Sequence, residues 1–286
     1  MRVAILGASG FLGSRLAAAL RARGDSVEAL SLRDPEAAAD TAADCDAVVN
    51  VAGESIAQRW SSTVKHRLQY SRTELPGRFL ERIGRRDRRP RTYVSASAVG
   101  YYGTSETATF DESSPPGDDF LAHVCAQWEA QALQARDLGM RVAIVRGGVV
   151  LDPGGGALAK MLPPFRAGLG GVVGSGRQWI SWIHIEDAVR AYELAIDRIE
   201  GAVDATAPNP VTNAALTHAL GAAIGRPTLA PVPKIALRVM LGEGAVVLLE
   251  GQRVLPTRLI KEYGFEFRFP EIDGALRNLF HSNAKL

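Results

Sequence analysis

Three glycines near the start of the chain constrain its fold more than any other feature. They are Gly7, Gly10 and Gly13. An apolar run at residues 2–6 precedes them and reads as a buried strand, and residues 14–23 follow with helical spacing of leucines. A second apolar run at residues 27–32 completes the pattern. A strand, a glycine-rich turn, a helix and another strand in this order predict a dinucleotide-binding unit.

Each glycine of the turn has a physical role in such a unit. Gly7 allows a tight turn, Gly10 lets the backbone approach a pyrophosphate, and Gly13 lets the helix pack on the strand. The start of the helix then presents free N–H groups to the phosphates. We expect small residues at the ends of the next strands to join this site. The expected cofactor-binding residues are Gly7, Ala8, Ser9, Gly10, Phe11, Leu12, Gly13, Asn50, Ala52, Gly53 and Ser95.

The region after the second strand indicates which dinucleotide binds. The position that carries an acid in NAD-binding proteins is Ser31 here, and Arg33 follows it. A hydroxyl and a planar cationic fork suit a 2′-phosphate, whereas a carboxylate would repel it. We therefore predict NADP(H) over NAD(H). Asp34 is the alternative, since a small shift would place its carboxylate on the ribose.

Strands and helices continue to alternate as far as about residue 150, which predicts an α/β protein with a doubly wound, Rossmann-type parallel sheet. Residues 34–45 are too few for a helix, a strand and a helix, so the outer strand after strand 2 should be missing or vestigial. We expect a dinucleotide-binding domain over 1–150 plus about 178–206. A smaller substrate lobe would comprise about 151–177 plus 207–286.

Local patterns in the expected lobe predict three further details. A helix at residues 158–166 should be interrupted at Pro163 and Pro164. Asn213 should cap a helix that ends at Gly225. Alternation of apolar and polar residues over 264–270 predicts a strand.

Composition narrows the classes of partner. The 286 residues carry a formal net charge of +2, so we expect neither a nucleic-acid nor a membrane partner. Two cysteines, Cys45 and Cys125, are too few for a disulfide framework. No apolar run reaches membrane-spanning length, and we expect no signal peptide before the first strand. We expect a cytoplasmic protein with a small-molecule substrate. The five histidines are scattered, so no metal site is predicted.

Several motifs together resemble the extended short-chain dehydrogenase/reductase superfamily. Residues 7–13 match its glycine pattern, Val94-Ser-Ala-Ser97 its catalytic-serine strand, and Trp182-Ile-His-Ile-Glu-Asp187 a later strand-to-helix segment. The resemblance is sharper to its atypical "epimerase family" subgroup, which has a C-terminal domain of unknown function. The motifs of that subgroup occur here as Asn50-Val-Ala-Gly-Glu-Ser-Ile-Ala57, Ala207-Pro-Asn-Pro-Val-Thr-Asn213, Gly251-Gln-Arg-Val-Leu-Pro256 and Gly264-Phe-Glu-Phe267.

The resemblance also implies catalytic groups, and part of that set is absent. Ser97 occupies the serine position, but the superfamily also needs a tyrosine acid/base and a lysine four residues later. Alignment on Glu129 places Leu121 and Cys125 at the tyrosine and lysine positions. A shift of two residues places His123 and Gln127 there instead. Residues 104–140 contain neither tyrosine nor lysine. His123 is either a substitute acid/base or a residue that merely covers a helix face. Cys125 is more consistent with an inert buried thiol than a nucleophile. We expect Glu129 to hold a nearby arginine.

Two functions remain open at this point. The first is an NADP-dependent oxidoreductase or isomerase, similar to epimerases and dehydratases, with Ser97 and His123 as its catalytic candidates. The second is a catalytically inactive, nicotinamide-cofactor-binding regulator or scaffold. The candidate substrate-lining residues are Tyr101, Tyr102, Arg177, Gln178 and Trp179. Helices expected over 63–82 and 120–137 could pair two copies into a homodimer.

Overall fold

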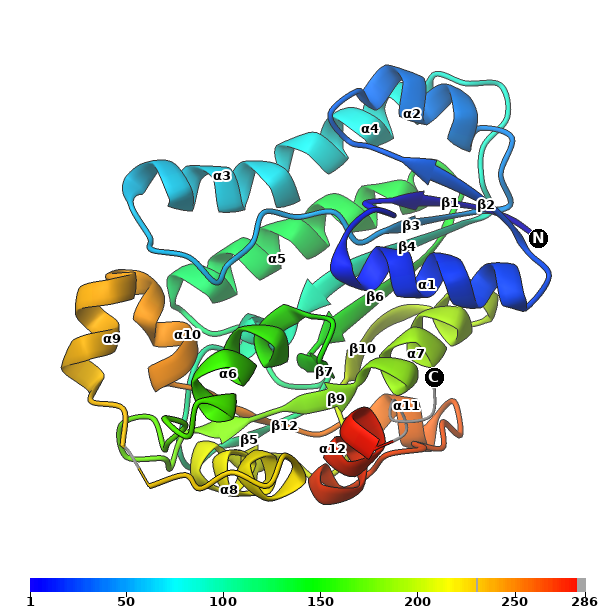
Figure 1. The fold of residues 1–286 in the computed structure, drawn as a ribbon. Helices are drawn as coiled ribbons and strands as arrows, with labels where there is room; N and C mark the ends of the chain where they lie inside the picture. The colour runs from blue at the N-terminus through cyan, green and yellow to red at the C-terminus, as the bar shows by residue number, and fades with distance from the viewer. Residues whose placement is uncertain (230, 282–286) are drawn as a thin grey trace.

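The structure is a computed structural model that describes residues 1–229 and 231–281. Six parallel strands form its central sheet in the order β10-β6-β4-β3-β1-β2 (Figure 1). Their bounds are β1 (Arg2–Leu6), β2 (Ser26–Leu30), β3 (Ala47–Asn50), β4 (Thr92–Ala98), β6 (Arg141–Gly147) and β10 (Gly201–Ala205). The predicted parallel α/β sheet is confirmed. All six carboxyl ends lie at the same edge, where open α/β sheets bind ligands.

Helices cover both faces of this sheet. One face packs against α1 (Phe11–Ala22) and α7 (Ile185–Asp197), and the other against α2 (Pro35–Ala42), α4 (Glu74–Gly84) and α5 (Phe120–Leu133) (Figure 1). Side chains alternate between the two cores, as a strand requires. Val3 and Ile5 of β1 belong to the first core, and Ala4 and Leu6 to the second. Helix α3 (Ser62–Arg72) leads directly into α4.

The predicted loss of an outer strand is confirmed. Between β2 and β3 the chain forms one short helix, α2, so β2 is an edge strand of the sheet. The Asp34 carboxylate begins α2 by accepting a hydrogen bond from the Ala37 N–H at 3.1 Å. Pro35 follows at the first helical position, which its fixed φ suits.

The remaining elements are short, and several of them gather beyond the carboxyl ends of β4 and β6 (Figure 1). Three two-stranded pairs join β7 to β9, β12 to β5 and β11 to β8. The strands are β5 (Thr109–Phe110), β7 (Val149–Asp152), β8 (Trp179–Ile180), β9 (Trp182–His184), β11 (Val211–Thr212) and β12 (Arg253–Val254). The helices are α6 (Gly156–Arg166), α8 (Asn213–Ala223), α9 (Lys234–Leu241), α10 (Val246–Leu249), α11 (Thr257–Lys261) and α12 (Ile272–His281), with 3-10 turns η1 (Val99–Tyr102), η2 (Gln134–Arg136) and η3 (Glu243–Ala245).

Two predictions about helices of the C-terminal part are wrong. Helix α6 is continuous through Pro163 and Pro164, and the Ala167 N–H donates to the Pro163 carbonyl beyond them. The cap of α8 is Thr212, whose hydroxyl accepts from the Ala215 N–H. Asn213 is the first residue of α8 instead, and its side-chain oxygen accepts from the Val173 N–H at 2.9 Å.

The predicted strand at residues 264–270 is also wrong. The backbone N–H groups of Arg268 and Phe269 donate to the two carboxylate oxygens of Asp187, at 3.0 and 2.9 Å. Asp187 is fully buried in the first turn of α7. A buried carboxylate therefore satisfies the amides that a neighbouring strand would otherwise have paired.

Candidate active site and cofactor-binding edge

The glycine turn lies at the carboxyl edge of the sheet, packed between α1 and the end of β3. Gly7 has a φ of +90°, and a Cβ there would lie 2.9 Å from the backbone of Ala52. A Cβ on Gly13 would lie 2.2 Å from the Gly7 carbonyl oxygen. The Gly10 N–H donates to that same oxygen at 2.9 Å. Only glycine fits this close approach of two backbones, as the sequence predicted.

Helix α1 begins at Phe11 rather than at residue 14, immediately beyond the turn. Its cap is Gly10, which has no side chain to hydrogen-bond the free N–H groups of the first turn. The Phe11 ring packs against Gly155 and Gly156, where an added Cβ would lie 2.2 and 2.8 Å from ring atoms. Ser9 and Gly10 are exposed. An exposed, uncapped helix N-terminus after a glycine turn fits a pyrophosphate.

The loop after β2 carries the residues on which the predicted cofactor preference depends. The Ser31 hydroxyl accepts from the Arg33 N–H at 3.2 Å, and both residues are exposed. Asp34 Oδ1 accepts from the Ala37 N–H as the α2 cap. Arg33 has no carboxylate within ion-pairing distance in the described part of the chain. The Arg33 guanidinium and one Asp34 carboxylate oxygen are thus both exposed beside the end of β2.

Two predicted cofactor residues, Asn50 and Ser95, are buried and hydrogen-bonded within the protein. Asn50 is fully buried; its side-chain oxygen accepts from the Ala52 N–H, and its amide donates to the Tyr93 hydroxyl. Ser95 is also buried, and its hydroxyl donates to the Ala96 carbonyl. Gly53, by contrast, is exposed at the end of β3.

A buried polar network surrounds Ser97 at the end of β4. The Ser97 hydroxyl donates to Glu129 Oε1 at 2.7 Å. Arg146 of β6 donates to both carboxylate oxygens of Glu129, each at 2.8 Å. Its third bond, from Nη1, goes to the Tyr102 hydroxyl, which in turn donates to Asp204 at 2.8 Å. The expectation that Glu129 holds an arginine is correct, although the sequence did not single out Arg146 or Asp204.

Burial and hydrogen bonding together shift the pKa values of the groups in this network. Burial opposes the charge on Arg146, but its hydrogen bonds to Glu129 outweigh that effect and raise the pKa of the guanidinium. Burial raises the pKa of Asp204 well above its usual range, and the nearby Glu112 carboxylate adds to the shift. Burial also raises the pKa of the Tyr102 hydroxyl. Arg146 therefore stays cationic, and Tyr102 stays protonated.

The face of α5 that meets this network carries no proton-donating pair. Leu121 and Cys125 both approach Gly100, where an added Cβ would lie 3.5 Å from Leu121 Cβ and 3.9 Å from Cys125 Sγ. Burial raises the pKa of the Cys125 thiol to about 12. Leu121 instead packs in an apolar cluster formed around Trp60, Val64 and Leu68. The register set by Glu129 is thus the one that faces the site.

His123 does not reach Ser97. It lies on the exposed side of α5, and its Nδ1 is 2.7 Å from the Asp119 carbonyl oxygen. Gln127 of the same register is exposed too and hydrogen-bonds Gln69 of α3. A helix turns by about 100° per residue, so positions two apart point in nearly opposite directions. This geometry removes the support for His123 as a substitute acid/base.

The five predicted substrate residues divide into two groups. Tyr101 lies beside the network, with the Arg146 guanidinium 3.6 Å from its ring centroid, whereas Tyr102 is buried within it. The other three residues belong to the loop before and at the start of β8. Arg177 is exposed and paired with Glu106, the Trp179 indole donates to the Glu106 carbonyl, and Gln178 is buried.

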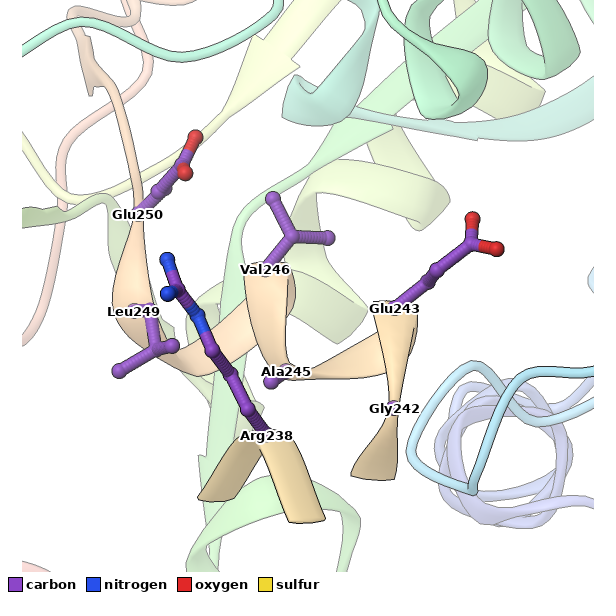
Figure 2. A pocket seen from close by; sticks show the side chains of 7 residues that line it. All are labelled: Arg238, Gly242, Glu243, Ala245, Val246, Leu249 and Glu250. Carbon is purple, nitrogen blue, oxygen red and sulfur yellow. The ribbon is translucent and has the colours of Figure 1, made fainter. Parts of the chain in front are cut away.

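Two pockets lie away from these residues. The first, about 430 Å³, lies at the turn between α9 and α10 (Figure 2). Its acidic side chains have partners elsewhere, because Glu243 pairs with Lys65 and Glu250 accepts from the Thr104 hydroxyl. The second, about 500 Å³, lies between α1, α7 and α12. Neither pocket is lined by a predicted site residue.

No helix in residues 1–229 and 231–281 is long and apolar enough to cross a membrane.

Two family models match the chain. The model of the "NAD dependent epimerase/dehydratase family" matches residues 3–209, and that of a domain of unknown function, DUF1731, matches residues 232–279. The second match falls within the predicted C-terminal lobe.

Similar proteins occur in distant organisms. The chain is 44% identical over 300 residues to "Epimerase family protein SDR39U1 homolog, chloroplastic" of Arabidopsis thaliana, covering 97% of this chain and 86% of that protein. It is 40% identical over 294 residues to human "Epimerase family protein SDR39U1", covering 98% and 99%. A crystal structure of the human protein (isoform 2) with NADPH superposes with a TM-score of 0.88 at 37% identity, over 98% of this chain and 99% of that one. The chain therefore belongs to the NAD dependent epimerase/dehydratase family.

Proposed function

We propose that this protein binds NADP(H) along the carboxyl edge of its sheet and acts as an oxidoreductase or isomerase on a small substrate near Ser97. The observation that carries the proposal is the buried Ser97–Glu129–Arg146 arrangement beside an intact dinucleotide turn. A buried ion pair stabilises a fold only weakly, because desolvation offsets its attraction. Its place at the ligand-binding edge points to a use in holding Ser97.

The residues of the turn fit the pyrophosphate of such a cofactor. The uncapped start of α1 would face it, and the close backbone approach at Gly13 leaves no room for a side chain. When bound, NADP(H) supplies or accepts a hydride. The chain's own contribution is to position the reacting oxygen. The Ser97 hydroxyl donates its proton to Glu129, so its oxygen is left to act as an acceptor. It would therefore accept a hydrogen bond from a substrate hydroxyl.

Preference for NADP(H) over NAD(H) is part of the proposal. Ser31 and Arg33 would contact the 2′-phosphate, and Asp34 is occupied at the start of α2. The NADPH in the structure of the human relative supports the same choice. The substrate contacts through Tyr101 and the 177–179 loop remain a proposal, as does a homodimer formed through α3, α4 and α5.

Binding and turnover test these statements separately. Calorimetric titration should show tighter binding of NADPH than of NADH, and Arg33→Gln should remove most of the difference. Turnover would be screened against carbonyl compounds and nucleotide sugars. Any activity found should fall by at least about tenfold in Ser97→Ala and persist in His123→Ala. Tighter binding of NADH would refute the cofactor preference.

A specific observation favours a second function, that of a cofactor-binding regulator without chemistry. Leu121 and Cys125 place an apolar side chain and a thiol of raised pKa where the superfamily resemblance implies a proton donor and its partner. Tight NADPH binding with no turnover on any panel would support this alternative.

A further inference from the structure

The pocket of about 500 Å³ between α1, α7 and α12 lies outside the proposed active site; Figure 1 shows the three helices. It follows one side of α7, because Glu186, Val189 and Glu193 recur at spacings of three and four residues and all line it. Glu186 and Glu193 are seven residues apart, which is about 10 Å along a helix. Val189 and Ala19 of α1 pack against the main apolar core between them. The pocket thus offers an apolar stretch with a polar group at each end.

The end of the pocket at the start of α7 has unused hydrogen-bond donors. Leu151 pairs with His184 in the β7–β9 ladder, so the next residue, Asp152, lies at this end. Arg15 of α1 donates from Nε to Asp152 at 2.9 Å, and its terminal nitrogens have no acceptor among residues 1–229 and 231–281. The Arg15 side chain is about half exposed. Its planar guanidinium is therefore open to a ligand carboxylate.

His184 adds a buried donor at the same end. Its ring is 1% exposed and stacks on Phe269, with the ring centroids 3.8 Å apart. Nδ1 accepts from the Glu186 N–H at 3.1 Å, and burial lowers the pKa of His184, so the neutral ring carries its proton on Nε2. Nε2 has no acceptor within hydrogen-bonding distance in the described ranges, although the Asn278 side chain is near the ring. A buried donor without an acceptor is costly, so a ligand oxygen here is favoured.

Glu193 lines the other end and has no direct partner. It accepts no hydrogen bond and forms no ion pair within the part of the chain that the structure describes. The neighbouring cations are used elsewhere, since Arg190 pairs with Asp187 and Arg23 with Asp197. Burial raises the pKa of Glu193, which is the direction expected of a carboxylate that lacks a partner. A half-buried carboxylate of this kind favours a ligand that donates N–H groups.

The charges that line the pocket restrict the class of ligand. Each of the three arginines, Arg15, Arg190 and Arg268, pairs with a carboxylate of the protein, which leaves Glu193 unpaired among the described lining residues. A simple anion would leave Glu193 without a partner, and a simple cation would leave the donors at the start of α7 unused. A ligand with a carboxylate at one end and an ammonium group at the other satisfies both ends. The apolar stretch between them fits an aliphatic chain.

We propose that this pocket binds a small ω-amino carboxylate, a zwitterion whose two charges are separated by an aliphatic chain. The carboxylate accepts from Arg15 and His184 Nε2, the ammonium group donates to Glu193, and the chain lies along Val189. The pocket shares no residue with the glycine turn or the Ser97 network. Binding at this site therefore does not depend on the proposed NADP(H) binding.

The test titrates the full chain with three probes and follows the backbone amides by NMR. 6-Aminohexanoate carries both charges, hexanoate lacks the ammonium group, and hexylamine lacks the carboxylate. We expect 6-aminohexanoate to shift amides of α1 and α7 around the pocket and to bind at least about tenfold more tightly than either of the other probes. Arg15→Met should lower its affinity to about that of hexylamine, since the carboxylate then loses its cation.

Glu193→Gln isolates the ammonium contact with a change of nearly the same shape. It should lower the affinity for 6-aminohexanoate to about that for hexanoate and leave hexanoate within about twofold of its wild-type affinity. Asp197→Asn removes a carboxylate from the same helix outside the pocket, so it is the matched control and should leave all three affinities unchanged.

Ala19→Met gives a second perturbation that keeps every charge. The longer side chain fills the apolar stretch from α1, so 6-aminohexanoate should bind at least about tenfold more weakly even if Glu193→Gln fails to fold. The inference is overturned if the three probes bind equally, or if 6-aminohexanoate gives no saturable shift up to about 50 mM. It is also overturned if Glu193→Gln and Asp197→Asn have the same effect, because the site would then respond only to the net charge of α7.

Discussion

Glu129 and Arg146 form a bidentate ion pair that joins α5 to β6. Each N···O distance is 2.8 Å, and each side chain is less than a tenth exposed. Removal of one partner of such a pair leaves an unpaired buried charge. We therefore expect Arg146→Met to lower the free energy of unfolding by about 3–5 kcal/mol, as measured by urea denaturation. The double variant Glu129→Gln/Arg146→Met should recover part of that loss.

An exposed ion pair gives the matched control for this prediction. Arg177 and Glu106 lie 3.3 Å apart with half or more of each side chain exposed. Arg177→Met should cost less than about 1 kcal/mol, because water already screens the pair. Equal losses in the two arginine variants would show that burial of the Glu129 pair has no energetic consequence.

Asp204 should make stability depend on pH in an unusual direction. Its pKa is raised in the folded protein, chiefly by burial, from an ordinary value of 3.8. Above that ordinary value the folded state binds more protons than the unfolded state, so this group destabilises the fold as the pH rises. Asp204→Asn removes the effect. Urea denaturation between about pH 4 and pH 7 should show the wild type losing stability relative to the variant. If the stability of the wild type and that of Asp204→Asn change equally with pH, the raised pKa of Asp204 is contradicted.

Both cysteines should be unreactive in the folded protein. Burial raises the pKa of Cys45 to about 11 and that of Cys125 to about 12. The thiolate is the reactive form, so at pH 8 iodoacetamide should modify either thiol at least about a hundredfold more slowly than in denaturant. Mass spectrometry of timed samples measures both sites. Rapid modification of native Cys125 would restore it as a candidate nucleophile.

Gly13→Ala should disable the cofactor turn. The new Cβ would collide with the Gly7 carbonyl oxygen at 2.2 Å, so α1 and the turn must move apart. We expect NADPH and adenosine 2′,5′-bisphosphate, a fragment that carries only the adenosine end of NADPH, both to bind about tenfold or more weakly. Gly274→Ala in α12 is the control. Within the described residues, its added Cβ would have no heavy atom within 4 Å apart from its chain neighbours and the backbone of its own helix, and alanine favours a helix by up to about 1 kcal/mol. Unchanged binding in Gly13→Ala would contradict the placement of the cofactor.

The sequence predicted those parts of the site that depend on local backbone geometry. The Gly7–Gly13 turn, the short connection at 34–45 and Ser97 at the end of β4 all follow from nearby residues. The sequence predicted that Glu129 would bind an arginine but did not identify which one. Arg146 is 17 positions away on another element, and Asp204 reaches Tyr102 from 102 positions away. No spacing rule identifies such pairs before the sheet order is known.

Two of the three wrong details, the strand at 264–270 and the cap of α8, involve hydrogen bonds to residues distant in sequence. Residues 264–270 have the alternation of a strand, but the Asp187 carboxylate from a distant helix takes two of their amides. Asn213 has the right chemistry for a cap, yet Thr212 precedes it and Asn213 binds Val173 instead. In each case a hydrogen bond to a residue distant in sequence takes the place of the bonding that the local pattern predicts.

The missing outer strand has a consequence for self-association. It leaves β2 with one unpaired side, and an open edge of a sheet can pair with the edge of another molecule. The edge is short, only Ser26–Leu30, and Glu28 at its centre carries a charge that pairs with Arg2. At the opposite edge, the Arg258 guanidinium donates to the Ala202 carbonyl of β10. One edge is thus protected by its brevity and charge and the other by a covering side chain, which disfavours aggregation through either.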